Sequence, residues 1–287
     1  MIATLSDIIE TYMDQGYTLT VRQLYYQVVA RDILPNNTKS YNRIKSLVND
    51  ARLAGLLDWD AIEDRTREFV RRARWESGSD ILQSVAQQYH MDRWVGQTVR
   101  PFVIVEKEAL VGVLERVCHE YDVPLLAARG YPSVSVLRAF VQSDILPVLD
   151  GGQGVMLLHL GDHDPSGIDM TRDLQDRLQL LQHGNGECWT VQRLALNMKQ
   201  VEEKSPPPNP AKTTDARFEG YRVIYGDESW ELDALEPAYL HELVENHVMH
   251  CIDKKKAWKA RAEEIDAIKT RLSATAADWA RPQAGRR

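Results

Sequence analysis

The sequence predicts an α/β protein, α+β overall, in which a helical N-terminal domain precedes a parallel-sheet domain and a partly helical C-terminal extension. Two observations predict this fold class. Over about the first 95 residues apolar positions recur at helical spacing, whereas after residue 100 short apolar runs alternate with helical segments. We therefore expect three regions, residues 1–95, 100–200 and 201–287, and a chain of 287 residues is long enough for two modest domains.

Composition places the chain among ordinary globular proteins, with 44% hydrophobic and 27% charged residues. The sequence contains no apolar run of membrane-spanning length, and its first residues lack the basic and apolar segments of a signal peptide. Its three cysteines are far apart and show no zinc-binding spacing, which is typical of a reducing compartment. We therefore expect a cytoplasmic protein with no membrane partner.

The N-terminal region has the outline of a winged-helix domain. A first amphipathic helix over Leu5–Met13 is followed by a helix over Val21–Ala30, for which Thr20 is a suitable N-cap. The amphipathic segment Tyr41–Arg52 follows, and then a short extended piece, Leu56–Trp59. This order favours a helix–turn–helix with Tyr41–Arg52 as its recognition helix, although a plain three-helix bundle has the same pattern.

The net charge of −7 is unevenly distributed along the chain. Residues 39–74 carry nine Lys and Arg against six Asp and Glu, whereas the rest of the chain from Glu76 carries 24 basic against 32 acidic residues. A DNA-contacting module joined to an acidic metal-binding module has this distribution, but so does a solvated helix face. The densest basic patch consists of Arg65, Arg67, Arg71, Arg72 and Arg74.

Four apolar runs predict the strands of the parallel sheet: Phe102–Val105, Leu125–Ala128, Val155–Leu160 and Trp189–Leu196. Helical segments separate them, as right-handed crossovers between parallel strands require. Two helices are expected in the C-terminal extension, over Pro237–Ile252 and Lys254–Ser273, after the proline-rich segment 205–210.

Two of these strands end in acidic residues. Glu106 follows the first strand, and Asp162 and Asp164 follow the third, two residues apart, so they project to one side while the chain is extended. Ligands of such sheets sit beyond the carboxyl ends of the strands. Three carboxylates at one rim repel each other unless a hard cation neutralises them, and Mg²⁺ is the obvious candidate. By itself the Asp-x-Asp pattern is a weak signal, because an acidic loop also produces it.

The second candidate site is the segment Arg22-Gln23-Leu24-Tyr25-Tyr26. Arg22 and Tyr26 are four residues apart and share one face of the predicted helix. A tyrosine hydroxyl has a pKa of about 10, so a nucleophilic tyrosine needs a nearby cation that favours the phenolate. Arg22 could supply this charge or bind a phosphate. For a tyrosine pair alone, packing in the core is the more common role.

Together these motifs resemble those of topoisomerase VI A subunits and the related meiotic double-strand-break protein. The pentapeptide is similar to the tyrosine motif of that family, with the nucleophile at Tyr26, although Gln23 stands where the family often has an acid. Glu106 resembles the glutamate of its Toprim domain, and Asp162 and Asp164 resemble its Asp-x-Asp-Pro-x-Gly motif. Gly130 lies where the family has a glycine-rich turn. The resemblance covers roughly residues 18–200, and the chain is as short as the mini-A versions of phages and mobile elements.

The resemblance implies Mg²⁺-dependent cleavage of double-stranded DNA. Tyr26 would attack a phosphodiester to form a 5′-phosphotyrosyl link, with Mg²⁺ held by Glu106, Asp162 and Asp164. Glu106 could instead act as a general acid. A homodimer is implied, since the tyrosine of one subunit works with the metal of the other. No ATPase motif is visible, so strand passage would need a separate ATPase subunit. The residues expected to hold the DNA backbone are Arg43, Lys45, Arg52, Arg65, Arg67, Arg71 and Arg72.

Two other functions fit the same sequence. A Toprim nuclease would hydrolyse DNA with metal and water and use Tyr26 only structurally, and a degenerate relative would bind DNA without cleaving it. Glu231 and Asp233 could add metal ligands, but we interpret them as surface charges. His241, His247 and His250 are interpreted as ordinary surface or packing residues, since no familiar zinc pattern includes them.

Overall fold

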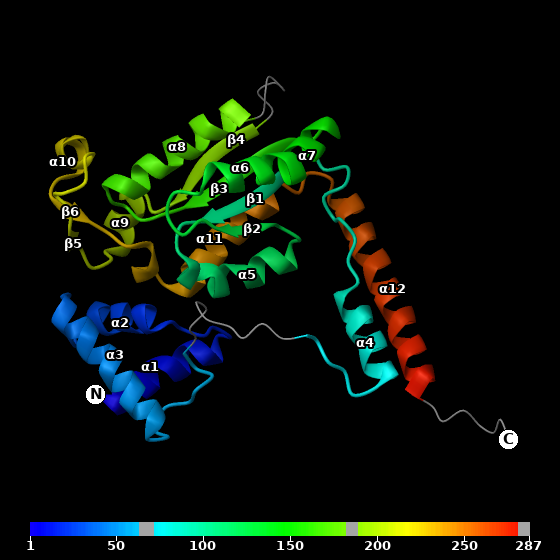
Figure 1. The fold of residues 1–287 in the computed structure, drawn as a ribbon, viewed down its shortest axis with the longest axis horizontal. Helices are drawn as coiled ribbons and strands as arrows, with labels where there is room; N and C mark the ends of the chain where they lie inside the picture. The colour runs from blue at the N-terminus through cyan, green and yellow to red at the C-terminus, as the bar shows by residue number, and fades with distance from the viewer. Residues whose placement is uncertain (63–71, 182–188, 281–287) are drawn as a thin grey trace. The chain divides into compact units, whose positions relative to one another are not determined.

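The computed structural model describes residues 1–62, 72–181 and 189–280 and shows a mixed α/β protein (Figure 1). N-terminal helices precede a four-stranded parallel sheet with interleaved helices, and the described chain ends in a long helix, as the sequence predicts. The chain forms two compact units: Met1–Thr66 with Val99–Cys251, and Arg67–Thr98 with Ile252–Arg287. Residues 201–251 therefore belong to the first unit, and α12 (Lys255–Ala280) belongs to the second. No described helix is both long and apolar enough to cross a membrane.

Three helices form the N-terminal part of the first unit: α1 (Ile2–Asp14), α2 (Val21–Ala30) and α3 (Thr38–Leu53). Helix α2 begins with a capping box, in which the Thr20 and Gln23 side chains each accept a hydrogen bond from the other's backbone N–H. One face of each helix is apolar, and these faces meet in a core whose fully buried members include Leu5, Leu24, Val28 and Ile44.

The predicted extended segment Leu56–Trp59 is wrong, because these residues form bends rather than a strand. Arg52 gives the physical reason: its guanidinium donates to the carbonyls of Trp59 and Ile62 and lies 5.2 Å from the centre of the Trp59 ring. These contacts fold the segment back over the end of α3. Among the described residues, this region contains one isolated β-bridge, a parallel pairing between Leu19 and Ile62.

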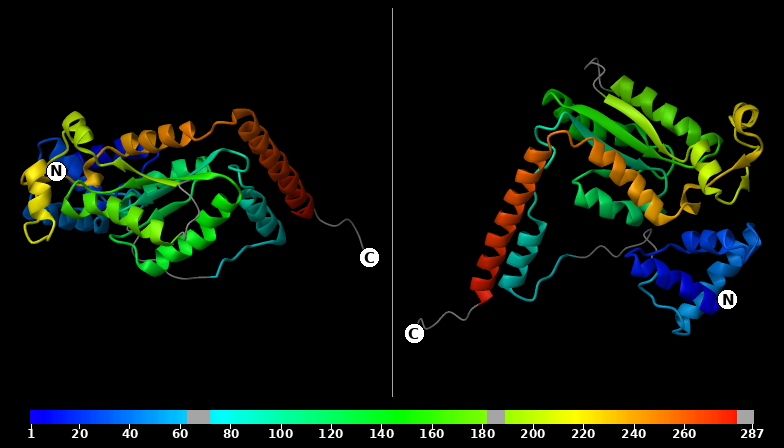
Figure 2. Two further views of the ribbon diagram at one scale, coloured as in Figure 1. Left: turned by 90° about the horizontal axis from the view of Figure 1, so that it is seen from above. Right: turned by 180° about the vertical axis from the view of Figure 1, so that it is seen from behind.

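The sheet has the strand order β2-β1-β3-β4, and all its pairings are parallel. Helices α6, α7 and α8 cover one face, and α5 lies with α11 (Pro237–His250) on the other (Figures 1 and 2). The strands are β1 (Val99–Val105), β2 (Leu125–Ala127), β3 (Gly154–Leu160) and β4 (Trp189–Ala195). The helical segments are η1 (Glu108–Leu110), α5 (Val111–Glu120), α6 (Val134–Phe140), η2 (Val141–Ile145), α7 (Leu146–Asp150) and α8 (Pro165–Leu181).

The strand order places a switch point at the centre of the sheet. After β1 the chain crosses to one side to form β2, and it then returns past β1 to form β3. Strands β1 and β3 are paired along their whole length, with Val105 opposite Leu160. The residues that follow these two strands therefore start side by side, at the position where open α/β sheets bind ligands.

The segment after β4 packs against the end of the sheet. A two-stranded antiparallel pair, β5 and β6, is followed by one antiparallel bridge between His163 and Trp230, which joins the segment to the loop after β3. The elements are α9 (Met198–Lys204), β5 (Asn209–Pro210), α10 (Phe218–Tyr225), β6 (Glu228–Ser229), η3 (Leu232–Ala234) and α11 (Pro237–His250).

The second unit is a helical pair formed by α4 (Gly78–Gln88) and α12 (Lys255–Ala280). The two helices are joined by a hydrogen bond from the Ser79 hydroxyl to the Ala276 carbonyl. Near the start of α12 the rings of Trp94 and Trp258 pack with their centres 4.8 Å apart. Aromatic packing of this kind stabilises the helical pair.

Candidate functional site

The acidic residues predicted from the strand ends lie together. Glu106 follows β1 and Asp162 lies two residues beyond β3, and the Glu106 carboxylate (Oε2) accepts a hydrogen bond of 3.0 Å from the backbone N–H of Asp162. Gly161 makes this approach possible, since a Cβ at this position would lie 2.9 Å from the same Glu106 oxygen. A side chain at the position before the Asp-x-Asp pattern would therefore push the Glu106 carboxylate away from the Asp162 N–H.

Asp164 has a second role, at the start of helix α8. Its Oδ1 accepts hydrogen bonds from the Gly167 N–H at 2.6 Å and from the Ser166 hydroxyl at 2.8 Å. This carboxylate satisfies an N–H of the first helical turn, and Pro165 is the first residue of the helix. A Cβ at Gly167 would lie 2.2 Å from the backbone carbonyl oxygen of Asp162, so glycine is required at this position.

Arg193 of β4 holds the acidic loop from within the protein, and our sequence analysis did not identify it. Its guanidinium donates to the carbonyls of Asp162 (2.6 Å), Gly167 (2.7 Å), Gly161 (3.1 Å) and Leu196 (3.2 Å), and to the Thr171 hydroxyl (3.0 Å). Burial lowers the pKa of Arg193 to about 10, against the opposing effect of the nearby acids. An arginine in the middle of a predicted buried strand was the available signal.

Burial also governs the ionisation of the acids. It raises the pKa of Glu106, which Asp164 raises further, and it raises the pKa of Asp162 to about 7 against the opposing effect of Lys107. Buried carboxylates that repel each other are the hard oxygen donors that Mg²⁺ binds, so the donor chemistry fits this ion. In the present arrangement, however, the described Asp, Glu, His and Cys residues form no group of three or more with metal-site geometry.

The predicted nucleophile, Tyr26, is buried on α2, with 3% of its surface exposed. Its hydroxyl accepts a 3.4 Å hydrogen bond from the Asn209 amide, and the Arg22 guanidinium lies 5.9 Å from its ring centre. Burial raises the pKa of Tyr26 to about 12, with help from two nearby carboxylates, and outweighs the lowering by Asn209 and Arg22. The phenol is therefore neutral here, so of the two roles considered for Arg22, this arrangement favours phosphate binding over stabilisation of a phenolate.

A chain of hydrogen bonds fixes both tyrosines of the motif. The Tyr25 hydroxyl donates to the Asn36 amide oxygen at 2.9 Å, and the Asn36 amide donates to Asn209 Oδ1 at 3.0 Å. The Asn209 amide then reaches Tyr26. Tyr26 is also one of the residues that line a cleft of about 400 Å³, together with Arg22, Tyr41 and Glu231.

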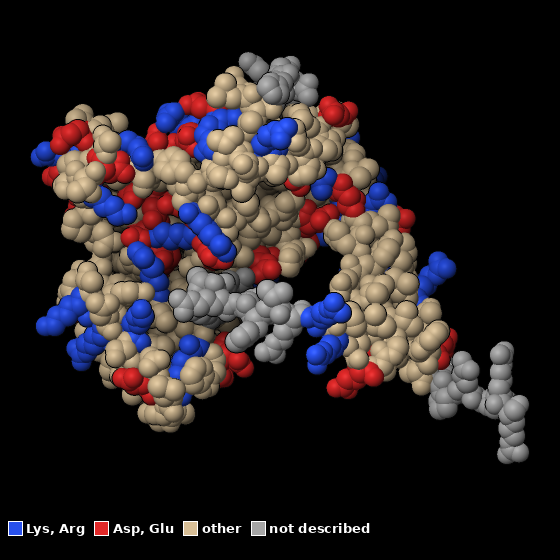
Figure 3. Space-filling view, in the orientation of Figure 1, with Lys and Arg blue, Asp and Glu red and all other residues tan. Residues whose placement is uncertain are grey.

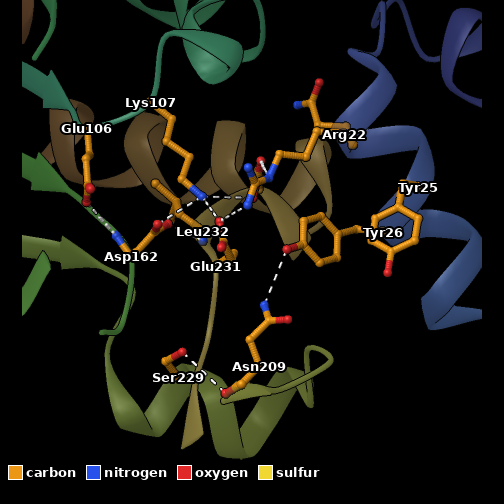
Figure 4. A network of polar contacts seen from close by, with 12 residues as sticks. Arg22, Tyr25, Tyr26, Glu106, Lys107, Asp162, Asn209, Ser229, Glu231 and Leu232 are labelled. Atoms are coloured by element: carbon orange, nitrogen blue, oxygen red, sulfur yellow. Dashed lines mark hydrogen bonds and ion pairs between the residues drawn. The ribbon is translucent and has the colours of Figure 1, made fainter. Parts of the chain in front are cut away.

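The interpretation of Glu231 and Asp233 as surface charges is wrong. The Asp233 side chain is fully buried and that of Glu231 is 23% exposed. Both carboxylates form ion pairs with Arg22, and Figure 4 shows that of Glu231. Arg22 Nη2 lies 2.6 Å from Glu231 Oε2, and Arg22 Nε lies 3.2 Å from Asp233 Oδ2. The spacing Glu-x-Asp after β6 carried no signal of these partners, which are about 200 residues away in the sequence.

Lys107 joins the same network from the side of the sheet. Its ammonium lies 2.9 Å from Asp162 Oδ2 and 3.2 Å from Asp233 Oδ1, and it also contacts Glu231 Oε2. Burial alone would lower the pKa of Lys107, but the three carboxylates raise it, so Lys107 is charged. Asp162 Oδ1 also accepts a 2.8 Å hydrogen bond from the Leu232 N–H. The segment 231–233 therefore contacts both the tyrosine helix and the acidic loop.

The residues predicted to hold DNA are in different positions. Arg43 and Lys45 are exposed on α3, Arg72 is exposed in the second unit, and Arg52 is engaged with its own loop. Arg65, Arg67 and Arg71 lie outside the described residues. Figure 3 shows basic side chains over the N-terminal helices and a mixture of acidic and basic side chains between these helices and the sheet. Their role in DNA binding stays a prediction.

Comparison with protein-family models and with curated proteins finds no match for this chain. The predicted motifs around residues 22–26, 106 and 162–164 lie in one unit and are connected by hydrogen bonds and ion pairs.

Proposed function

We propose that this chain is a DNA-cleaving transesterase that resembles the topoisomerase VI A subunit. One observation carries the proposal: three motifs far apart in the sequence meet in one ion-pair network, in which Arg22 contacts Glu231, Glu231 contacts Lys107, and Lys107 contacts Asp162. In this interpretation the N-terminal helices are a winged-helix-like domain that carries Tyr26, and the sheet is a Toprim-type domain.

The position of the acids supports a phosphate-processing site. Glu106 and Asp162 lie at the carboxyl ends of two central strands, where the strand order reverses. Tyr26 opens into a cleft that Arg22 and Glu231 also line, so a DNA backbone that entered it would meet the hydroxyl and a guanidinium together. A solvated acidic loop with no function would not need Arg193 and Lys107 buried against it.

The proposed reaction exchanges one ester for another. The Tyr26 oxygen forms a bond to phosphorus and loses its proton, while the bond from phosphorus to the 3′ oxygen breaks, and that oxygen takes up a proton. Arg22 would orient the phosphate, and Asn209 would hold the Tyr26 oxygen. Glu106, Asp162 and Asp164 would hold Mg²⁺, which would stabilise charge on the phosphate and the leaving oxygen. Glu106 could alternatively be the acid that protonates the 3′ oxygen.

The proposed partners follow from the resemblance. They are double-stranded DNA held by Arg43, Lys45 and the other basic positions, a second copy of the chain, and, for strand passage, a separate ATPase subunit. In the resembling family the tyrosine acts with the acids of the other subunit. In this structure Arg22, one turn from Tyr26, reaches the acid network of its own chain.

A metal-dependent nuclease without a covalent intermediate is the second candidate, and the state of Tyr26 favours it. The side chain is almost completely buried, and burial keeps its hydroxyl neutral. A structural tyrosine has these properties, and water would then be the nucleophile.

A covalent-trapping experiment decides between the two functions. End-labelled linear DNA and supercoiled DNA are incubated with the protein and Mg²⁺, and the reaction is stopped with denaturant. We expect label attached to protein in the wild type and in Tyr25→Phe, a matched change on the same helix, but none in Tyr26→Phe or Asp162→Ala. Free cleaved ends in wild type and Tyr26→Phe alike would replace this proposal with the nuclease. No cleavage under any of these conditions would count against both.

A further inference from the structure

We propose that Arg22 and Lys107 form a binding site for one DNA phosphodiester group, and that the Glu231 carboxylate occupies this site as an internal substitute in the absence of DNA. The inference rests on the proposed function, because it names the group of the substrate that these two cations bind. It adds Lys107 to the substrate-binding residues and assigns Glu231 the role of a displaceable anion.

The geometry around Glu231 is that of a bound oxyanion. A single oxygen, Glu231 Oε2, contacts both cations: it lies 2.6 Å from Arg22 Nη2 and also contacts Lys107 Nζ (Figure 4). A guanidinium fork and an ammonium that meet on one oxygen are a common arrangement around phosphate. A phosphodiester carries one negative charge, as Glu231 does, so the exchange leaves the charge of the network unchanged.

Exposure distinguishes Glu231 from the other acids of the network. The Glu231 side chain is 23% exposed and lines the same cleft as Tyr26, whereas the Asp233 side chain is fully buried. Asp233 lies 3.2 Å from both cations, through Oδ2 to Arg22 and through Oδ1 to Lys107. When Glu231 leaves, Asp233 would therefore keep the two cations in place.

The backbone around Glu231 is anchored on both sides, so the side chain can move alone. Before it, the Trp230 N–H and carbonyl form two backbone hydrogen bonds with His163, of 2.9 and 2.8 Å. After it, the Leu232 N–H donates to Asp162. Rotation of one glutamate side chain into the cleft would free both cations at the position beside Tyr26.

The test is DNA binding without metal, which does not depend on cleavage. A fluorescently labelled duplex of about 30 base pairs is titrated with protein in EDTA, and binding is followed by anisotropy. Removing the competing carboxylate in Glu231→Gln should tighten binding about tenfold, which corresponds to the removal of one charge-assisted contact. Glu228→Gln removes the same charge from an exposed position nearby and should change binding by less than about twofold.

The dependence on Lys107 supplies the second arm. In the Glu231→Gln background, Lys107→Arg should keep the gain and Lys107→Gln should remove it. Equal effects of Glu231→Gln and Glu228→Gln would overturn the proposal, and this comparison decides it even if Lys107→Gln does not fold. Tighter binding without any covalent adduct would keep the phosphate site and reject the transesterase. A covalent adduct in the wild type, together with unchanged DNA binding in Glu231→Gln, would keep the transesterase and reject the phosphate site.

Discussion

The two halves of the site are held by different forces. On α2, Tyr25 and Tyr26 are fixed by an apolar core and by hydrogen bonds to the neutral amides of Asn36 and Asn209. At the end of the sheet, Asp162 is fixed by charged or polar groups: Lys107, the Leu232 N–H, and Arg193 on its carbonyl. One half depends on packing and the other on charge.

This difference determines how each half should respond to perturbation. Packing contributes to stability at every pH, and it is lost when volume is removed. A network of buried charges depends on the protonation of its members and of buried neighbours that must stay neutral. The comparison can therefore be tested by asking which substitutions change stability uniformly and which change its dependence on pH.

The largest effect is expected on the packing side, from Leu24→Ala. Leu24 is completely buried between the N-terminal helices, so its loss leaves a cavity next to Tyr25. We expect a loss of about 2–5 kcal/mol in the free energy of unfolding, of equal size at pH 7 and pH 5, measured by denaturant titration. Leu53→Ala, at a side chain that is 70% exposed, is the matched control and should cost less than about 0.5 kcal/mol. A Leu24→Ala loss that differed strongly between the two pH values would contradict the assignment of this half to packing.

The corresponding test on the charged side is His159→Phe. His159 lies in β3, fully buried, and burial lowers its pKa from 6.5 to about 3, with a further contribution from Arg193. The folded protein keeps this ring neutral, whereas the unfolded chain takes up a proton below pH 6.5. His159 therefore has almost no effect on the free energy of unfolding at pH 7. It lowers this free energy progressively as the pH falls from 6.5 towards 3.

At pH 5 this loss amounts to about 2 kcal/mol relative to pH 7. His159→Phe lacks the titrating group. Between pH 7 and pH 5 its free energy of unfolding should therefore fall by about 2 kcal/mol less than that of the wild type. The measurement is the difference between wild type and variant at each pH, in which the other titrating groups cancel. Parallel pH profiles for the two proteins would show that His159 contributes nothing to acid sensitivity.

Features set by local sequence could be predicted. Helix α2 was expected at Val21–Ala30 and is found there, because Thr20 and Gln23 form its capping box within four residues. The four strands were predicted from their short apolar runs, and parallel pairing placed Glu106 and Asp162 side by side. Both predictions needed only neighbouring residues and one topological rule.

Features set by distant partners could not be predicted. From the sequence alone Asp233 cannot be distinguished from an exposed acid. Its ion-pair partners, Arg22 and Lys107, both lie more than 100 residues away in the sequence. The segment 56–59 was expected to be extended from its apolar residues, but Arg52 folds it into bends. In each case a long basic side chain selects its partner only after the fold has formed.

The smallest effect is expected at Asn209. A change at this residue can distinguish a structural role from a catalytic role of the hydrogen bonds around Tyr26. Its amide donates to the Tyr26 hydroxyl, and its Oδ1 accepts from Asn36. Asn209→Ala should cost about 1 kcal/mol, and if the lost bond acts in the reaction, adduct formation should slow roughly fivefold. Ser229→Ala is the control, since its hydroxyl donates to the Asn209 backbone carbonyl in the same pair of strands and leaves the Asn209 amide unchanged.

Asn209→Asp then distinguishes the two roles of this residue. The Asp side chain keeps the oxygen that accepts from Asn36 but replaces the donor to Tyr26 with a negative charge. If Asn209 only holds the loop in position, Asn209→Asp should form the covalent adduct faster than Asn209→Ala. If its donated hydrogen bond lowers the pKa of Tyr26, as the structure indicates, Asp should form the covalent adduct more slowly than Ala, because a carboxylate beside the phenol opposes its ionisation. The rank order of these two variants therefore tells whether the neutral amides of this half position the tyrosine or also activate it.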